Sequence, residues 1–230
     1  MTRYIVANWK SYKTLSQAEK WIETFCSLYH PDPHVHVIIA PPAVYLAPLF
    51  QSLRKYNHSH LSLAAQDLSP YPMGSYTGAV AGDMIRNFVD YAIVGHSERR
   101  RYFHETNQEV AQKVAEAAAA EIKPILCVDL PYARAQIAAL DEADMGDLVV
   151  GYCPVEAIGL DIPQSPEKIR AAVEEIQVYA PEKPIFYGGS INAANAGDCI
   201  AIEGISGLMV GTACLDAKNF AGICRAVSQP

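Results

Sequence analysis

The residues best suited to chemistry follow residues 92–94, a short apolar run that stops at Gly95. His96 and Glu98 come directly after that glycine, and two arginines follow them. A histidine can share or exchange a proton near neutral pH, and a glutamate can orient a cationic neighbour. An apolar run that ends in this way is typical of a buried parallel strand. A solvated basic loop is the alternative, but a turn at the end of a buried strand favours a functional site.

Other polar or glycine-rich segments repeat this arrangement, each directly after a short apolar run. The residues concerned are Asn8 and Lys10, Gln66 and Asp67, Cys153, Gly188, Gly189 and Ser190, and Gly211 with Thr212. The last two segments are rich in glycine, and backbone N–H groups in such turns can bind a phosphate. Taken alone, the glycines could simply terminate strands, Lys10 could be a surface lysine, and His96 could be a core histidine.

The elements that must position these residues are short apolar runs that alternate with helical patterns. The expected strands are residues 4–7, 35–40, 61–65, 91–94, 125–128, 148–152, 184–187 and 207–210. The expected helices are residues 16–29, 106–121, 133–140 and 166–179. Ser16 and Glu19 have the spacing of a capping box, and Ser165 precedes Pro166, which suits the first helical position.

Alternating strands and helices predict an α/β fold with parallel strands joined by right-handed crossovers. Eight such units in 230 residues fit a closed (β/α)8 barrel, slightly shorter than the usual ~250 residues. A doubly wound open sheet competes, but the first strand is not followed by G-x-G-x-x-G. We expect one domain over residues 1–230. In a closed barrel the polar segments would converge on the rim formed by the carboxyl ends of the strands.

The composition describes an acidic chain with a net charge of −7, half of whose residues are hydrophobic. This charge argues against nucleic acid binding, which needs a basic face, but a local basic site can still bind an anionic small molecule. The six cysteines form no C-x-x-C pair and no metal spacing, so we expect reduced core thiols and no metal site. No apolar stretch approaches the ~20 residues of a membrane span. We therefore expect a cytoplasmic protein with no membrane or nucleic acid partner.

Five motifs, in the same order and over nearly the whole chain, resemble those of the triosephosphate isomerase family. They are Ala7-Asn8-Trp9-Lys10, Gly74-Ser75-Tyr76-Thr77-Gly78, Val94-Gly95-His96-Ser97-Glu98-Arg99-Arg100, Tyr187-Gly188-Gly189-Ser190 and Gly207-Leu208-Met209-Val210-Gly211-Thr212-Ala213. The resemblance implies a single TIM barrel. It also implies interconversion of dihydroxyacetone phosphate and glyceraldehyde 3-phosphate, with no metal or organic cofactor.

The resemblance assigns roles to individual residues. Neutral His96 would polarise the substrate carbonyl, Lys10 would supply positive charge, Asn8 would help to hold the oxyanion, and Glu98 would orient polar neighbours. The substrate phosphate would bind at Ser190, Gly211 and Thr212. An enediolate needs fixed hydrogen-bond donors in a site that excludes water, and these side chains are donors of the right type.

The largest departure from the family pattern is Cys153, which stands before Pro154 where the family has its glutamate base. Free thiols have a pKa of about 8.5, so only a few per cent is thiolate at pH 7. The cysteine side chain is also shorter, and proton transfer needs heavy atoms within about 3 Å of each other. Loss of a positioned base typically costs about 10²- to 10⁴-fold in rate.

The segment expected to form the active-site lid departs as well. Residues 159–162 read Gly-Leu-Asp-Ile where the family has Gly-Thr-Gly-Lys. Gly159 can still donate its N–H group to a phosphate, whereas Asp161 would bring an unfavourable negative charge if it pointed inward. Glu156 could replace the missing base, but a hydrogen bond at the lid hinge is the favoured interpretation. Asp129 stands where relatives commonly have glycine and glutamate.

Residues 70–78 form a long loop with apolar and aromatic side chains, and the resemblance implies that this loop enters a partner subunit. Such a patch would be unusual if left exposed, so we expect a homodimer. A loop packed on its own subunit is the alternative. The segment between the fifth and sixth strands is short, as in compact relatives that form tetramers, so a tetramer is also possible.

Several functions fit these observations. The leading hypothesis is triose-phosphate isomerase activity that is reduced or rebuilt around Cys153. A non-catalytic protein that binds phosphosugars is the main rival. A glutamate replaced by cysteine in the laboratory would explain the base, although the changes at Leu160, Asp161 and Asp129 favour natural divergence. An aldolase that forms a Schiff base through Lys10 is disfavoured, because such lysines usually belong to later strands.

Overall fold

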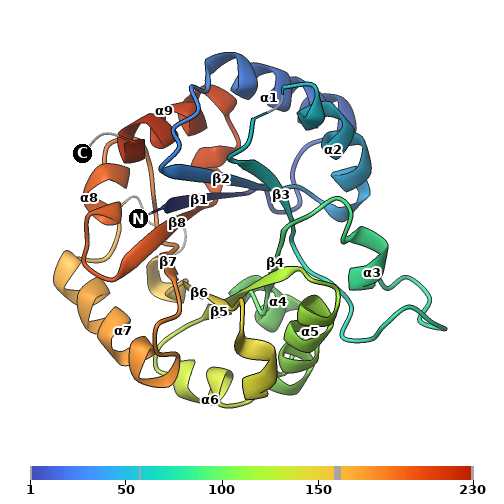
Figure 1. Cartoon of the computed structure of the whole chain (residues 1–230). Helices are drawn as coiled ribbons and strands as arrows, with labels where there is room; N and C mark the ends of the chain where they lie inside the picture. Colours follow the sequence, from blue (N-terminus) through green and yellow to red (C-terminus); the bar gives the residue numbers. More distant parts are fainter. Residues whose placement is uncertain (1, 57, 158–161, 229–230) are drawn as a thin grey trace.

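The computed structural model describes residues 2–56, 58–157 and 162–228. In this part of the chain eight parallel strands pair in chain order and close into a barrel (Figure 1). They are β1 Arg3–Asn8, β2 Val35–Ala40, β3 Leu61–Ala65, β4 Tyr91–Val94, β5 Lys123–Val128, β6 Val149–Tyr152, β7 Ile185–Tyr187 and β8 Ile205–Val210. The fold is a (β/α)8 TIM barrel, and the predicted fold class is confirmed.

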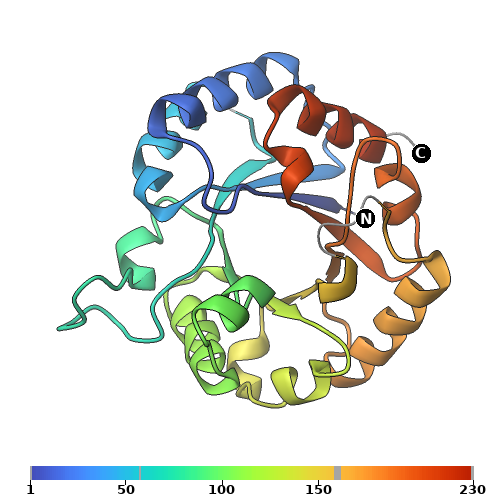
Figure 2. The same ribbon diagram turned by 180° about the vertical axis from the view of Figure 1, so that it is seen from behind.

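Helices alternate with the strands and surround the barrel, with α1 beside α9 in both views (Figures 1 and 2). The α-helices are α1 Leu15–Leu28, α2 Leu46–Arg54, α3 Gly82–Ile85, α4 Ser97–Tyr102, α5 Asn107–Ala119, α6 Ala133–Ile137, α7 Pro166–Tyr179, α8 Ala196–Ile200 and α9 Ala217–Ser228. The 3₁₀ helices are η1 Ala43–Tyr45, η2 Glu142–Met145, η3 Val155–Ala157 and η4 Thr212–Cys214. The sequence had predicted only α1, α5, α6 and α7.

Alternate strand residues enter two separate cores. Ile38, Ile125 and Phe186 belong to the cluster inside the barrel. Their neighbours along the strands, such as Ile39 and Leu126, pack in the layer between the sheet and the helices. Both faces of the strands are therefore buried, which is why the strands are recognisable as mainly apolar runs.

The predicted start of the first helix was wrong. Thr14, rather than Ser16, is the N-cap of α1, and its side chain accepts a hydrogen bond from the Gln17 backbone N–H. The Gln17 side chain in turn accepts from the Thr14 N–H at 2.8 Å, which completes a capping box. Glu19 therefore takes no part in the cap. The predicted cap of α7 is confirmed, since the Ser165 side chain accepts from the Lys168 N–H with Pro166 in the first turn.

A buried cluster of charged side chains joins the loop after β3 to α4 and α5. Lys113 of α5 contacts Asp67 at 2.6 Å and Glu105 at 2.5 Å. Arg99 of α4 contacts Asp67 at 2.9 Å and also binds Glu105. The Lys113 and Glu105 side chains are almost fully buried, so each charge depends on its partners. This cluster fixes the short helix that begins directly after β4.

The segment between β3 and α3 projects from the ring of helices in both views (Figures 1 and 2). Tyr71 and Tyr76 stack on each other there, with ring centroids 4.5 Å apart. Tyr71, Met73 and Tyr76 nevertheless remain 43%, 62% and 44% exposed, so packing within the loop does not bury them. Among the described residues, no helix combines the length and apolar character that crossing a membrane requires.

Candidate active site

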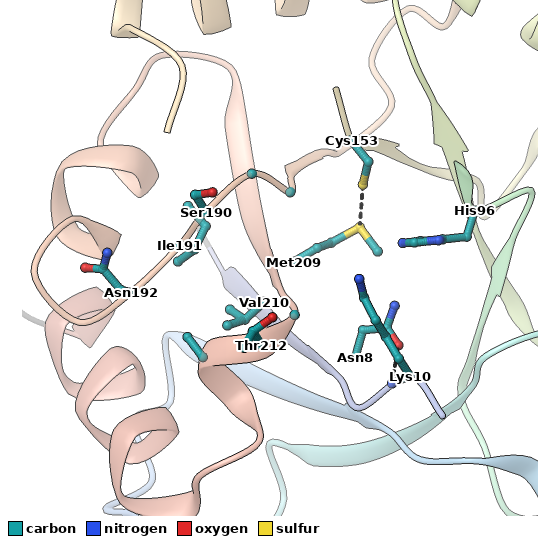
Figure 3. A pocket seen from close by; sticks show the side chains of 14 residues that line it. Asn8, Lys10, His96, Cys153, Ser190, Ile191, Asn192, Met209, Val210 and Thr212 are labelled. Carbon is teal, nitrogen blue, oxygen red and sulfur yellow. Dashed lines mark hydrogen bonds between the residues drawn. The ribbon is translucent and has the colours of Figure 1, made fainter. Parts of the chain in front are cut away.

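A cavity of about 280 Å³ opens at the carboxyl ends of the strands. Its wall contains residues at or just after the carboxyl ends of β1, β4, β6, β7 and β8, strands that are distant in sequence. The lining residues are Asn8, Lys10, His96, Cys153, Gly188, Gly189, Ser190, Ile191, Asn192, Met209, Val210, Gly211, Thr212 and Ala213. Figure 3 shows Lys10, His96 and Cys153 around Met209, with Ser190, Asn192 and Thr212 on the other side. The cavity lies just below the ~300–1,000 Å³ typical of drug-sized ligands and suits a smaller molecule.

The end of β1 places Asn8 and Lys10 in the cavity wall. Lys10 has φ of 51°, in the left-handed region that non-glycine residues rarely adopt. Its backbone N–H donates to Asn8 Oδ1 at 3.0 Å, and its carbonyl accepts from Gln66 Nε2 at 2.9 Å. Gln66 Nε2 also donates to the Ala40 carbonyl at 2.8 Å. Gln66 therefore holds the loop that carries the lysine, a supporting role that its sequence position did not reveal.

Lys10 and Glu98 form an ion pair, with Nζ and Oε1 2.6 Å apart. Glu98 lies in the first turn of α4, and its backbone N–H donates to His96 Nδ1 at 3.2 Å. Because Nδ1 accepts this hydrogen bond, the neutral ring carries its proton on Nε2. Burial lowers the pKa of His96, against the opposing effect of Glu98. The imidazole is thus held neutral at pH 7, with a donor N–H available to a ligand.

Two glycine-containing turns, after β7 and after β8, form the opposite wall of the cavity. Ser190 has φ of 48°, and its carbonyl accepts from Asn195 Nδ2 at 3.0 Å. Gly211 caps η4, the 3₁₀ helix that begins at Thr212. A Cβ atom added at Gly211 would lie 3.9 Å from Lys10 Nζ, so the ammonium group sits beside this turn. Backbone N–H groups together with a nearby cation suit an anionic group such as a phosphate.

Cys153 lies at the carboxyl end of β6, only 5% exposed, and faces sulfur-containing neighbours. Its thiol donates to Met209 Sδ at 3.7 Å (Figure 3). Its backbone N–H donates to the Val128 carbonyl at 3.1 Å, which extends the pairing of β5 and β6. Sequence reasoning missed Met209 as a site residue. Its place two residues before Gly211, on the inward face of β8, was the available signal.

The hinge of the expected lid is held by hydrogen bonds around Gln164. Glu156 accepts from Gln164 Nε2 at 2.7 Å, and Gln164 Oε1 accepts from the Tyr152 hydroxyl at 2.9 Å. The Gln164 backbone N–H donates to the Tyr187 hydroxyl at 3.0 Å. Glu156 is not among the described residues that line the cavity, and its contact supports the hinge interpretation rather than that of a base. Gly159 lies outside the described residues.

Nearby, burial raises the pKa of Asp129, and the negative charge of Glu156 acts in the same direction. Within residues 2–56, 58–157 and 162–228, no group of three or more His, Cys, Asp or Glu side chains is arranged to hold a metal ion.

The fold and this cavity define a (β/α)8-barrel protein with a polar site at the carboxyl ends of its strands. A family profile described as triosephosphate isomerase matches residues 3–227. The chain belongs to the triosephosphate isomerase family.

Curated relatives named triosephosphate isomerase agree with this assignment. The chain is 36% identical to the protein of Paracidovorax citrulli, covering 98% of each chain. It is 35% identical to that of Xanthomonas euvesicatoria, covering 99% of each chain. It is 33% identical to that of Dehalococcoides mccartyi, covering 96% of this chain and 94% of the relative.

Proposed function

We propose that the protein interconverts dihydroxyacetone phosphate and glyceraldehyde 3-phosphate, with catalysis reduced because Cys153 stands at the base position. Family membership and the names of the relatives support an isomerase acting on a phosphorylated triose. The observation that carries the proposal is the shared cavity, in which Lys10 and neutral His96 face two glycine-rich turns. A wall with Lys10 and His96 opposite a wall of two turns suits a molecule that has a carbonyl at one end and a phosphate at the other.

In this mechanism the phosphate binds at Ser190, Gly211 and Thr212, and the carbonyl oxygen faces His96. As the proton next to the carbonyl leaves, negative charge develops on that oxygen. His96 Nε2–H and the Lys10 ammonium group stabilise this charge, with Asn8 beside them. Glu98 keeps the ammonium group in place through their 2.6 Å contact. Gly159 would add a donor from the lid.

Cys153 is the group in this wall that takes the place of the base. To act, the thiol must lose its proton and turn from Met209 Sδ toward the substrate carbon. The cysteine side chain is also shorter than glutamate, and proton transfer needs heavy atoms within about 3 Å of each other. We therefore expect turnover about 10²- to 10⁴-fold below that of an enzyme with a positioned carboxylate.

A coupled spectrophotometric assay of the purified protein tests this function. The wild type should convert triose phosphates faster than buffer alone, and Cys153→Glu should raise the rate. Cys153→Ala should remove the base and lower turnover further. Cys199→Ala, a change at a buried cysteine outside the cavity lining, is the matched control and should leave the rate unchanged. Wild-type turnover at the buffer level, with no gain in Cys153→Glu, would contradict the proposal.

A non-catalytic protein that binds phosphosugars is the second candidate. The observation that favours it is the hydrogen bond by which the Cys153 thiol points its proton at Met209 within an apolar cluster. Calorimetry with a phosphorylated enediolate analogue should then show binding. Incubation of the substrate in deuterated water should show no exchange at the reacting carbon. Exchange above the buffer rate would exclude this candidate.

We also propose that the protein acts as a homodimer in the cytoplasm. Tyr71, Met73 and Tyr76 form an exposed apolar surface that a second subunit would cover. A tetramer remains compatible with the same surface. The six cysteines are free and buried, which supports a reducing compartment.

A further inference from the structure

A second cavity, of about 320 Å³, lies at the amino ends of β3 and β4. Its wall comes from α2, from the start of β3 and from residues 86–90, which lead into β4. Because the strands are parallel, this cavity lies at the other end of the barrel from the rim that holds Lys10 and His96. The described residues of its wall are all different from those that line the active-site cavity.

Two arginine side chains give this wall a positive charge. Arg54 ends α2 and Arg86 directly follows α3. Among the described residues Arg54 has no carboxylate partner, and its guanidinium group lies 5.8 Å from the ring centroid of Phe50. Arg86 approaches Asp83 at 3.7 Å with both side chains about half exposed, so water weakens that pair. Both guanidinium groups are therefore available to a carboxylate or phosphate, which they bind with paired hydrogen bonds.

Two aromatic rings form an apolar surface beside these charges. Phe50 and Phe88 are half-buried, with ring centroids 5.7 Å apart and ring planes at 63°. Both rings border the cavity, together with the buried side chains of Leu53 and Val89. A planar ring on a ligand can pack edge to face on a phenylalanine and can stack on the guanidinium plane of Arg54.

Polar side chains in the same wall can bind further atoms of a ligand. The Ser62 hydroxyl, in a residue only 8% exposed, is held by a 2.7 Å hydrogen bond with His36 Nε2. His58 Nε2 is buried and has no hydrogen-bond partner in the part of the chain that the structure describes. A buried polar atom without a partner is uncommon, and a ligand that reached this nitrogen would satisfy it. Asn87 adds an exposed amide at the opening.

We propose that this cavity is a second ligand site, which binds an aromatic acid: a planar ring that carries one carboxylate or phosphate group. The oxyanion pairs with Arg54 and Arg86, and the ring packs on Phe50 and Phe88. Asp90 is the only acidic side chain among the described residues of the wall, so the two guanidinium groups outweigh its charge. The volume lies near the lower end of the ~300–1,000 Å³ that ligand pockets occupy, which suits a single ring with its acidic group.

Isothermal titration calorimetry of the full-length protein tests this site. Benzoate and phenyl phosphate are the probes, and they distinguish a carboxylate from a phosphate as the preferred acidic group. At least one of them should bind. Acetate lacks the ring and benzyl alcohol lacks the charge, so each should bind at least about tenfold more weakly than the better probe.

Matched variants locate the bound probe. Arg54→Gln and Arg86→Gln should each weaken binding about tenfold or more, because each removes a charged hydrogen-bond donor. Asp90→Asn should tighten binding, because it removes the opposing charge. Arg134→Gln, at an exposed arginine of α6, is the control and should bind as the wild type does. Lys10→Gln, a change in the active-site cavity, should also leave the affinity unchanged.

Several outcomes would overturn the proposal: no binding of either probe at millimolar concentration, binding that is lost in Lys10→Gln but kept in Arg54→Gln, or acetate that binds as tightly as benzoate. If an arginine variant does not fold, as judged by circular dichroism, a wild-type crystal soaked with the better probe decides, and a probe found in the active site alone would contradict the second site. The proposal does not rest on isomerase turnover. Binding that depends on Arg54 and Arg86 in a protein without isomerase activity would contradict only the proposed function.

Discussion

His96 shows how the backbone decides the chemistry of one residue. Its Nδ1 accepts from the first turn of α4, and burial lowers the pKa of the ring. A single hydrogen bond thus selects the tautomer, and burial selects the charge. The positive charge of Lys10 also lowers the pKa of the ring, whereas the Glu98 carboxylate raises it.

This neutral state predicts a pH dependence of stability. The unfolded chain binds a proton at His96 below about pH 6.5, whereas the native ring stays neutral to lower pH. The contribution of His96 to stability is thus fully present above pH 6.5 and declines as the pH falls toward the native pKa. In that window the wild type should lose up to about 1.4 kcal/mol per pH unit more than His96→Gln.

Urea unfolding between pH 5 and pH 7.5 would measure this difference. The pKa of His36 is also lowered by burial, so some decline should persist in the variant. His30→Gln, a change at an exposed histidine, is the control and should follow the wild type. Parallel curves for the wild type and His96→Gln would contradict the neutral assignment.

At the scale of helices and strands, the start of α1 offers a direct test of capping. Thr14 satisfies a free N–H group of the first turn, whereas Ser16 lies within the helix and is exposed. Thr14→Ala should therefore lower the free energy of unfolding by about 1 kcal/mol. Ser16→Ala should change it by less than about 0.5 kcal/mol. Chemical denaturation of both variants decides between them, and an equal loss would refute the assigned cap.

The charged cluster behind α4 predicts a larger effect. Lys113→Met leaves the buried carboxylate of Glu105 and that of Asp67 without their shared ammonium group. Removing one partner of a buried ion pair costs about 3–5 kcal/mol. Urea unfolding should show a loss of this size, while Lys123→Met, at an exposed lysine, should change stability by less than about 0.5 kcal/mol. A loss below 1 kcal/mol would mean that Arg99 alone is a sufficient partner.

The sequence predicted the strands better than the helices, for a physical reason. The bounds of β2, β3 and β4 agree with prediction, because burial on both faces makes each a mainly apolar run, interrupted only by His36 in β2 and Ser62 in β3. The helix α4 was missed because its six residues are mostly charged and have no apolar stripe. The convergence of Lys10 and His96 was foreseen because strand ends in a barrel share one rim.

Other parts of the site depend on contacts that sequence spacing does not encode. Its position two residues before Gly211 puts Met209 on the inward face of β8, but its contact with the Cys153 thiol depends on packing inside the barrel. The role of Gln66 likewise requires the position of a carbonyl in another loop.

At the scale of the whole molecule, the projecting loop predicts an assembly of two subunits. Burying Tyr71, Met73 and Tyr76 in an interface would remove apolar surface from water. A charge placed there would have to be desolvated, so Met73→Asp should dissociate the dimer. Val178→Asp, at a site that is 74% exposed on α7, is the matched control.

Multi-angle light scattering would report the mass of each species. The wild type and Val178→Asp should have twice the mass of the chain, and Met73→Asp should have the mass of one chain. A wild type that is monomeric at micromolar concentration would exclude the dimer.

The bare backbone at Gly188 limits how this protein can change over generations. A Cβ atom there would lie 2.7 Å from Cys153 Sγ and 3.2 Å from Met209 Cβ. Even an alanine at position 188 would displace the Cys153 sulfur. The effects of substitutions at positions 153, 188 and 209 should therefore not be additive, because these residues are in contact. A glutamate at position 153, which is larger than cysteine, should tolerate a side chain at position 188 even less.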